Sequence, residues 1–151
     1  MNKNCVICKH LDEPSRNILT TDHWVVALAS DQGYLGRCYV TLRQHKGDLS
    51  SLTSQEWAEF GAIAKQLEQA CQKALGAAPF NWACMMNNAY QVKPAEPHVH
   101  WHFRPRYEES VEINGLTFTD PQFGHHYDRD QRQKVDSKTF QTILGKIKTS
   151  L

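Results

Sequence analysis

The stretch at residues 98–105 reads His98-Val99-His100-Trp101-His102-Phe103-Arg104-Pro105. Its three histidines alternate with apolar residues, and a period of two is typical of a half-buried β-strand. In a strand the three imidazoles share one face, spaced roughly 6–7 Å apart, and the apolar residues between them face a core. A helix would scatter the rings, because positions two apart do not share a helix face. The stretch therefore predicts a strand that carries a row of imidazoles on an apolar backing.

Length and composition limit the classes of protein to which this chain can belong. With 151 residues and 40% hydrophobic content, we expect a single domain over residues 1–151 with a sizeable core. The formal charge of +1 does not resemble the basic footprint of a nucleic-acid binder. No apolar run reaches the length needed to span a bilayer, and the start of the chain lacks the core of a signal peptide. We therefore expect a cytoplasmic protein without membrane or nucleic-acid partners, whose five cysteines are thiols or metal ligands.

The sequence on either side of the histidine row predicts more strands and two helices. Short runs rich in β-forming residues predict strands at 17–20, 24–29, 37–43 and 80–86. Thr53 and Glu56 fit a capping box, and Gly76 suits the end of the long helix that starts there. That helix carries an apolar stripe, which consists of Trp57, Phe60, Ala64, Leu67, Cys71 and Ala74.

The last third of the chain has a weaker pattern. Residues 108–119 predict an irregular strand pair around Asn114-Gly115, and residues 137–151 have the apolar spacing of a terminal helix. Together these elements predict an α+β fold, with an antiparallel sheet of about five strands, one long helix and a C-terminal helix.

Two further features suggest ligands for a metal ion. Cys5-Val6-Ile7-Cys8 is a C-x-x-C motif, which supplies half of a tetrahedral zinc site and needs two more ligands. A redox pair or a chance spacing explains this motif nearly as well. His45 follows the third predicted strand, where a side chain can reach a site but where surface histidines are also common.

Three aligned imidazoles permit two kinds of chemistry. They can bind a first-row divalent metal, for which imidazole is a favoured ligand. Alternatively, a neutral imidazole can attack phosphorus near pH 7 and so divide one difficult displacement into two easier ones. The spacing of the histidines does not decide between these alternatives.

The stretch from His98 to Arg104 resembles the H-φ-H-φ-H-φ-φ signature of the histidine triad family of nucleotide hydrolases and transferases. The order of the other features is also similar to that of bacterial members: an early C-x-x-C, two strands, a histidine after the third strand, a long helix and an asparagine-bearing strand end. The resemblance covers Cys5 to Tyr107 and leaves 108–151 as an extension without a family interpretation.

The resemblance implies roles for the residues of the row. His100 would be the nucleophile that forms a nucleotidyl-phosphohistidine, which water then cleaves. His102 would contact the phosphate and assist the leaving group, and Asn87 falls where the family places an asparagine near the phosphate.

The resemblance also implies a metal site and an assembly. In zinc-bearing relatives a structural zinc is held by residues that correspond to Cys5, Cys8, His45 and His98. The alternative is a zinc-free variant in which the histidines are only hydrogen-bonded. Family members commonly form two-fold dimers, so we expect a homodimer.

The sequence departs from the family pattern around the substrate. Lys93-Pro94-Ala95 stands where many members have Gly-Gln-Ser/Thr, so Lys93 is the candidate to replace the missing phosphate donors. Ala29 stands where members have a ribose-binding aspartate, and Asp31 follows two residues later. Arg104 is a candidate to add positive charge near a phosphate, although a solvated strand-end arginine is an equal alternative.

The implied function is a nucleotide phosphohydrolase or nucleotidyltransferase that cleaves at a nucleoside α-phosphate through a covalent intermediate on His100. The departures leave an alternative, a nucleotide-binding or zinc-stabilised interaction module with little or no catalysis. A third interpretation treats the triad as a catalytic metal site.

Overall fold

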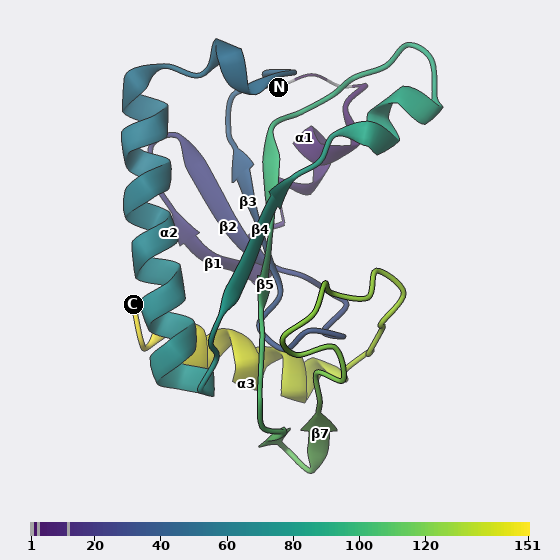
Figure 1. Ribbon diagram of the computed structural model, residues 1–151. Coiled ribbons are helices and arrows are strands. Elements are labelled where there is room, and N and C mark those ends of the chain that lie inside the picture. The colour runs from purple at the N-terminus through teal and green to yellow at the C-terminus, as the bar shows by residue number, and fades with distance from the viewer. Residues whose placement is uncertain (1, 3, 12) are drawn as a thin grey trace.

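The histidine row lies inside a five-stranded antiparallel sheet (Figure 1). The computed structural model describes residues 2, 4–11 and 13–151. In spatial order the strands are β1 (Asn17–Thr20), β2 (Trp24–Leu28), β3 (Cys38–Leu42), β5 (His100–Pro105) and β4 (Phe80–Cys84). With the helices described below, this arrangement confirms the predicted α+β class and the antiparallel sheet.

Strand β5 carries the triad and is paired along both edges. In its register Tyr39 of β3 lies opposite His102, Thr41 lies opposite His100, and Ala83 of β4 lies opposite His102. The strand begins two residues later than the predicted start at His98. Residues before it still bond to the body, because the N–H of Val99 donates to the carbonyl of Lys46 at 2.8 Å. Pairing on both edges holds the backbone of the row rigidly.

Helix α2 (Ser54–Leu75) covers the apolar face of the sheet. The predicted capping box is present at Thr53, and Gly76 ends the helix in the left-handed conformation with φ of 72°. Phe60 stacks on Trp101 at 4.8 Å between ring centroids. The apolar residues between the histidines therefore pack under α2, as the period of two predicts.

The buried stripe of α2 is rotated from the predicted one. Leu67 and Cys71 are buried as expected, but Ile63 and Ala70 are buried too, while Trp57 is exposed. Glu56 is buried in the first turn because its carboxylate accepts a hydrogen bond from Lys46 Nζ at 2.6 Å. A charged residue with such a partner can be buried, and apolar periodicity alone does not reveal it.

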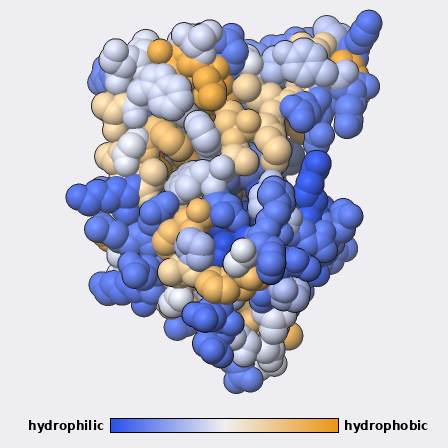
Figure 2. Space-filling view, viewed as in Figure 1, coloured by the Kyte–Doolittle hydropathy of each residue, from blue (hydrophilic) through white to orange (hydrophobic). Residues whose placement is uncertain are grey.

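The C-terminal third forms a hairpin, a long connection and a helix. The hairpin joins β6 (Val111–Ile113) to β7 (Leu116–Phe118) through Asn114 and Gly115, both with positive φ, as two-residue turns require. Helix α3 (Ser137–Lys148) packs against α2 and β1 (Figure 1). Figure 2, seen from the same side, shows hydrophilic side chains over the lower right, where the connection before α3 runs.

Short helices precede β1 and also lie between later elements in the chain order. They are α1 (Val6–His10), η1 (Pro14–Arg16), η2 (Leu49–Ser51) and η3 (Asn87–Gln91). Within the described parts of the chain, every helix is too short or too polar to cross a bilayer.

Candidate active site and metal centre

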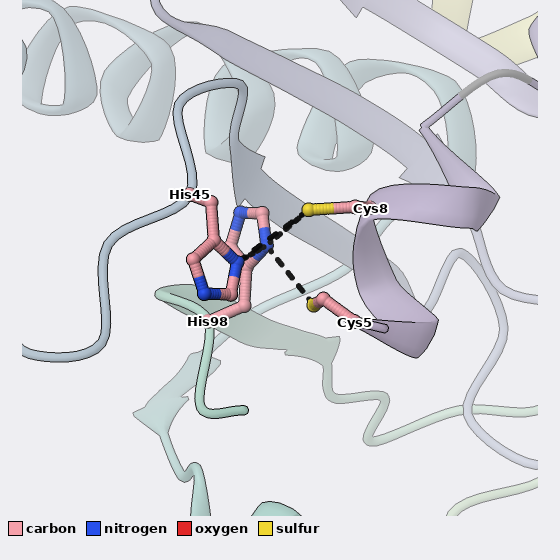
Figure 3. A group of neighbouring side chains, drawn as sticks. All are labelled: Cys5, Cys8, His45 and His98. Carbon is pink, nitrogen blue, oxygen red and sulfur yellow. Dashed lines mark hydrogen bonds between the residues drawn. The ribbon is translucent and has the colours of Figure 1, made fainter. Parts of the chain in front are cut away.

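Two cysteines and two histidines meet where α1 approaches the start of the triad strand (Figure 3). Cys5 directly precedes α1 and Cys8 lies within it, His45 comes from the loop after β3, and His98 from just before β5. One ligand atom from each residue lies within 4.8 Å of the others. These are the four residues that the family resemblance implies as zinc ligands.

Four of the distances between ligand atoms in this cluster match a tetrahedral metal centre. His98 Nδ1 lies 3.5 Å from Cys5 Sγ and 3.3 Å from Cys8 Sγ. His45 Nδ1 lies 3.5 Å from Cys8 Sγ and 3.3 Å from His98 Nδ1. A tetrahedral zinc with bonds of about 2.3 Å to sulfur and about 2.0 Å to nitrogen separates sulfur from nitrogen by roughly 3.5 Å and two nitrogens by roughly 3.3 Å. The donor set and its spacing therefore fit zinc.

The outer nitrogens of both histidine rings have partners that turn the inner nitrogens toward the centre. His98 Nε2 donates to the carbonyl oxygen of Leu42 at 2.6 Å, so its Nδ1 is free of hydrogen in the neutral ring. His45 Nε2 lies 3.4 Å from the carboxylate of Glu96. Burial lowers the pKa of His98, which favours the neutral form that binds metal. Such outer partners commonly orient metal-binding histidines.

The other two histidines of the row line a cavity that adjoins the metal cluster, since Cys5 also lines it. His100 and His102 form part of the wall of a cavity of about 600 Å³, and their ring centroids are 5.0 Å apart. The remaining wall is largely apolar and comes from α1, β2, β3 and the segment around η3. Of the three histidines only His98 belongs to the cluster with Cys5 and Cys8. The row therefore divides between a metal centre and a cavity.

The backbone determines the proton position on His100. Its Nδ1 lies 2.8 Å from the carbonyl oxygen of His98, which can only accept, so Nδ1 carries the hydrogen. Burial lowers the pKa of His100, although this hydrogen bond opposes the effect. The neutral ring therefore predominates near pH 7, and its lone pair is on Nε2.

His102 is held neutral even more strongly. Burial, followed by the positive charges of His100 and Arg104, lowers the pKa of His102 to about 3. The ring of Tyr39 packs edge-on against it at 5.1 Å. Its Nδ1 is buried and has no hydrogen-bond partner among the described residues.

The other candidate substrate-binding residues, Asn87, Lys93, Asp31 and Arg104, do not line the cavity. Asn87 and Lys93 are exposed, while Asn88 and Pro94 line the cavity. Asp31 bonds to Arg37 at 2.8 Å, and the neighbouring Ser30 lines the cavity. Arg104 is 5% exposed and lies under Tyr127, which is not the environment of a solvated strand-end arginine.

Other residues of the site were not singled out from the sequence. Tyr39 and Thr41 line the cavity because they lie opposite His102 and His100 on β3. Strand alternation within 37–43 contains this information once the pairing of the strands is known. Glu96 and Tyr127 carry no local signal, because their roles depend on contacts distant in sequence.

Comparison with known proteins gives a family match and several fold matches. A family model described as HIT domain matches residues 10–109. No curated protein matches the chain significantly in sequence. Among solved structures, a hypothetical histidine triad nucleotide-binding protein from Sulfolobus tokodaii is 14% identical, with a TM-score of 0.70 over 97% of this chain and 91% of that one.

Two other solved structures share the fold at similarly low identity. A zinc-bound histidine triad family protein from Mycobacterium smegmatis is 19% identical, with a TM-score of 0.60 over 96% of this chain and 94% of that one. A uridylyltransferase is 14% identical, with a TM-score of 0.67 over 97% of this chain and 44% of that one.

Proposed function

Because this chain belongs to the HIT domain family, whose members are mostly nucleotide hydrolases and transferases, we propose that it cleaves nucleotides through a covalent intermediate on His100. The reaction is the transfer of a nucleotidyl group from a nucleoside phosphoanhydride or phosphoramidate to the imidazole, and from there to water or another acceptor.

The observation that carries this proposal is the hydrogen bond from His100 Nδ1 to the carbonyl of His98. It assigns the lone pair to Nε2 in a ring that lines a cavity and is neutral near pH 7. A nucleophilic imidazole needs both properties, a free lone pair and a fixed orientation.

The proposed chemistry has two balanced steps. In the first, Nε2 of His100 forms a bond to the α-phosphorus, and the bond from phosphorus to the leaving oxygen or nitrogen breaks, with its electron pair going to the leaving group; a leaving nitrogen takes up a proton from solvent and departs as a neutral amine. In the second, water attacks the phosphorus and releases a proton to solvent, the N–P bond breaks, and the lone pair returns to Nε2. His102, the next ring in the row, contacts the phosphate and assists the leaving group by hydrogen bonding.

The residues around the cavity suggest how the substrate is held. The apolar wall from β2 and α1, which includes Val25, Ala27 and Ile7, suits a nucleobase. We propose that Asn87 and Lys93, which lie beside the cavity wall, make secondary contacts to the phosphates of the substrate. We also propose that Asp31 contacts the ribose.

The metal centre has a structural role in this proposal. Cys5, Cys8, His45 and His98 would hold zinc in a closed four-ligand site, which leaves no open position for substrate. The zinc would tie α1, one wall of the cavity, to the start of the catalytic strand. We also propose that the protein forms a homodimer, which light scattering during gel filtration tests directly.

The test of the catalytic proposal compares His100→Ala with His125→Ala, whose exposed side chain lies outside the cavity wall. Wild type and His125→Ala should turn over a dinucleoside polyphosphate or an adenosine phosphoramidate, and His100→Ala should not. Acid quenching of wild type should trap one nucleotidyl group on the protein, detected by intact mass and peptide mapping. Full activity in His100→Ala would reject the proposal.

The missing donors at Lys93-Pro94-Ala95 favour a second candidate, a nucleotide-binding protein without turnover. It is distinguished by nucleotide binding in calorimetry with no product from any member of the substrate panel.

A further inference from the structure

Arg104 extends the histidine row by one position. Alternation along β5 puts it on the same face as His100 and His102, next to His102. Its side chain is almost completely buried, at 5% exposure, yet it makes no hydrogen bond and no ion pair with any described residue. Arg106, two residues further on, instead forms an ion pair with Asp120.

An unpaired buried guanidinium is costly, because arginine stays charged and its donors lose water without gaining acceptors. Arg104 Nη1 and Arg37 Nε are both buried, and neither has an acceptor among the described residues. Two such donors, one on β5 and one in the residue before β3, indicate a place where an acceptor from outside the chain completes the hydrogen bonding.

The surroundings of Arg104 are strongly cationic. Arg37 precedes β3, the strand that pairs with β5, and its one carboxylate partner, Asp31, also contacts Arg132 at 3.4 Å. The charges of Arg104, Arg37 and Arg129 all contribute to the lowered pKa of His102. Positive charge therefore gathers at the end of the row opposite the metal centre.

The extension after residue 107 builds one wall of this region. The Arg104 guanidinium lies 4.2 Å from the centre of the Tyr127 ring. Stacking engages the face of a guanidinium and leaves its in-plane N–H groups for an acceptor. Arg106 holds the segment in place by donating to the carbonyls of Gln122 and His125. Arg104 does not line the cavity, whereas its neighbour on the same face of β5, His102, does.

We propose that Arg104 and Arg37, with Tyr127 as a wall, form a subsite for a phosphate group of the leaving group. The inference rests on the proposed function, in which the α-phosphate is bound at His100 and the leaving group departs beside His102. A leaving group that continues along the row meets the guanidinium of Arg104 next, at a spacing of roughly 6–7 Å per two strand residues. The preferred substrates are therefore nucleotides with a polyphosphate leaving group, rather than phosphoramidates that release a neutral amine.

The first test measures binding of inorganic pyrophosphate by calorimetry and does not require turnover. Arg104→Gln should weaken pyrophosphate binding by about 10- to 100-fold, as expected for loss of a charged hydrogen bond. The control is Arg43→Gln, since Arg43 is exposed at the far end of β3 and should leave the affinity unchanged. Unchanged affinity in folded Arg104→Gln would overturn the subsite. If that variant does not fold, Arg104→Lys replaces it in the test. Lysine keeps the positive charge but lacks the planar guanidinium, so this variant should bind pyrophosphate several-fold more weakly, and unchanged affinity would overturn the subsite.

The second test compares two substrates that differ in the leaving group. Arg104→Gln should lower kcat/KM for a dinucleoside polyphosphate by about 10- to 100-fold and leave that for an adenosine phosphoramidate nearly unchanged. Equal losses on both substrates would contradict the assignment to the leaving group. If wild type turns over neither substrate, the proposed function fails, and the pyrophosphate measurement still decides the subsite.

Discussion

Replacement of Cys8 by serine is expected to remove the metal and to lower the stability of the whole chain. Cys8 Sγ lies within 3.5 Å of ligand nitrogens from both His45 and His98, so it joins the N-terminal helix to two segments of the body. Serine is a poor zinc ligand, and three remaining ligands would leave the α1 segment without its strongest tie to the sheet.

The size of the effect follows from the preference of zinc for the folded chain. A ligand at 1,000 times its Kd stabilises the native state by about 4 kcal/mol. For a chain of about 150 residues, each kcal/mol shifts Tm by about 2–4 °C. We therefore expect Cys8→Ser to lower Tm by about 8–16 °C relative to the zinc-loaded wild type.

The assay combines elemental analysis with thermal melting, with and without a chelator. Wild type should contain one zinc per chain and lose stability on chelation, while Cys8→Ser should contain none and be insensitive to chelator. The matched control is Cys84→Ser, because Cys84 is half-buried at the end of β4 and outside the metal cluster. Metal-free wild type from zinc-supplemented growth, or equal Tm values for wild type and Cys8→Ser, would refute the reasoning.

Three further predictions concern stability. Burial opposes ionisation of Glu56, but hydrogen bonds from Lys46 and the helix N-cap outweigh it and lower its pKa, so this carboxylate stabilises the fold above its ordinary pKa and loses the effect as pH falls. Glu56→Gln should accordingly be less stable at pH 7 and flatten the acid side of a pH–stability curve from urea unfolding. Asp120→Asn should cost about 3–5 kcal/mol in chemical denaturation, because it leaves buried Arg106 unpaired. Gly33→Ala should lower Tm by several degrees, since a Cβ there would overlap the backbone of Gln131. An unchanged Tm would show that the backbone at Gln131 moves away at little cost in free energy.

The fold was largely predictable because its signals are local. Alternation at 98–105 depends only on the geometry of an extended backbone, and the Thr53 capping box on a single helical turn. The buried stripe of α2 was less predictable, since Glu56 is buried only because Lys46, ten residues earlier, reaches it. Periodicity cannot represent such a pairing.

The candidate site divides in the same way. Of the four metal-centre residues, only the C-x-x-C pair has a recognisable spacing, and the family resemblance is what implies that His45 and His98 complete the set. The wall of the cavity could not be assigned from sequence, and Asn88 rather than the neighbouring Asn87 lines it. One residue of rotation in a short helix decides which side chain faces inward.

By itself, the sequence determined the element types and the shared face of the histidines, because each follows from backbone geometry over a few residues, whereas the set of candidate metal ligands was implied by the family resemblance. Only the tertiary structure decided which nitrogen of His100 carries the proton, and that the buried guanidinium of Arg104 lies against Tyr127 without a hydrogen-bond acceptor in the described part of the chain. These properties depend on burial and on contacts between segments distant in the chain, which set hydrogen bonding and charge in ways that no local pattern encodes.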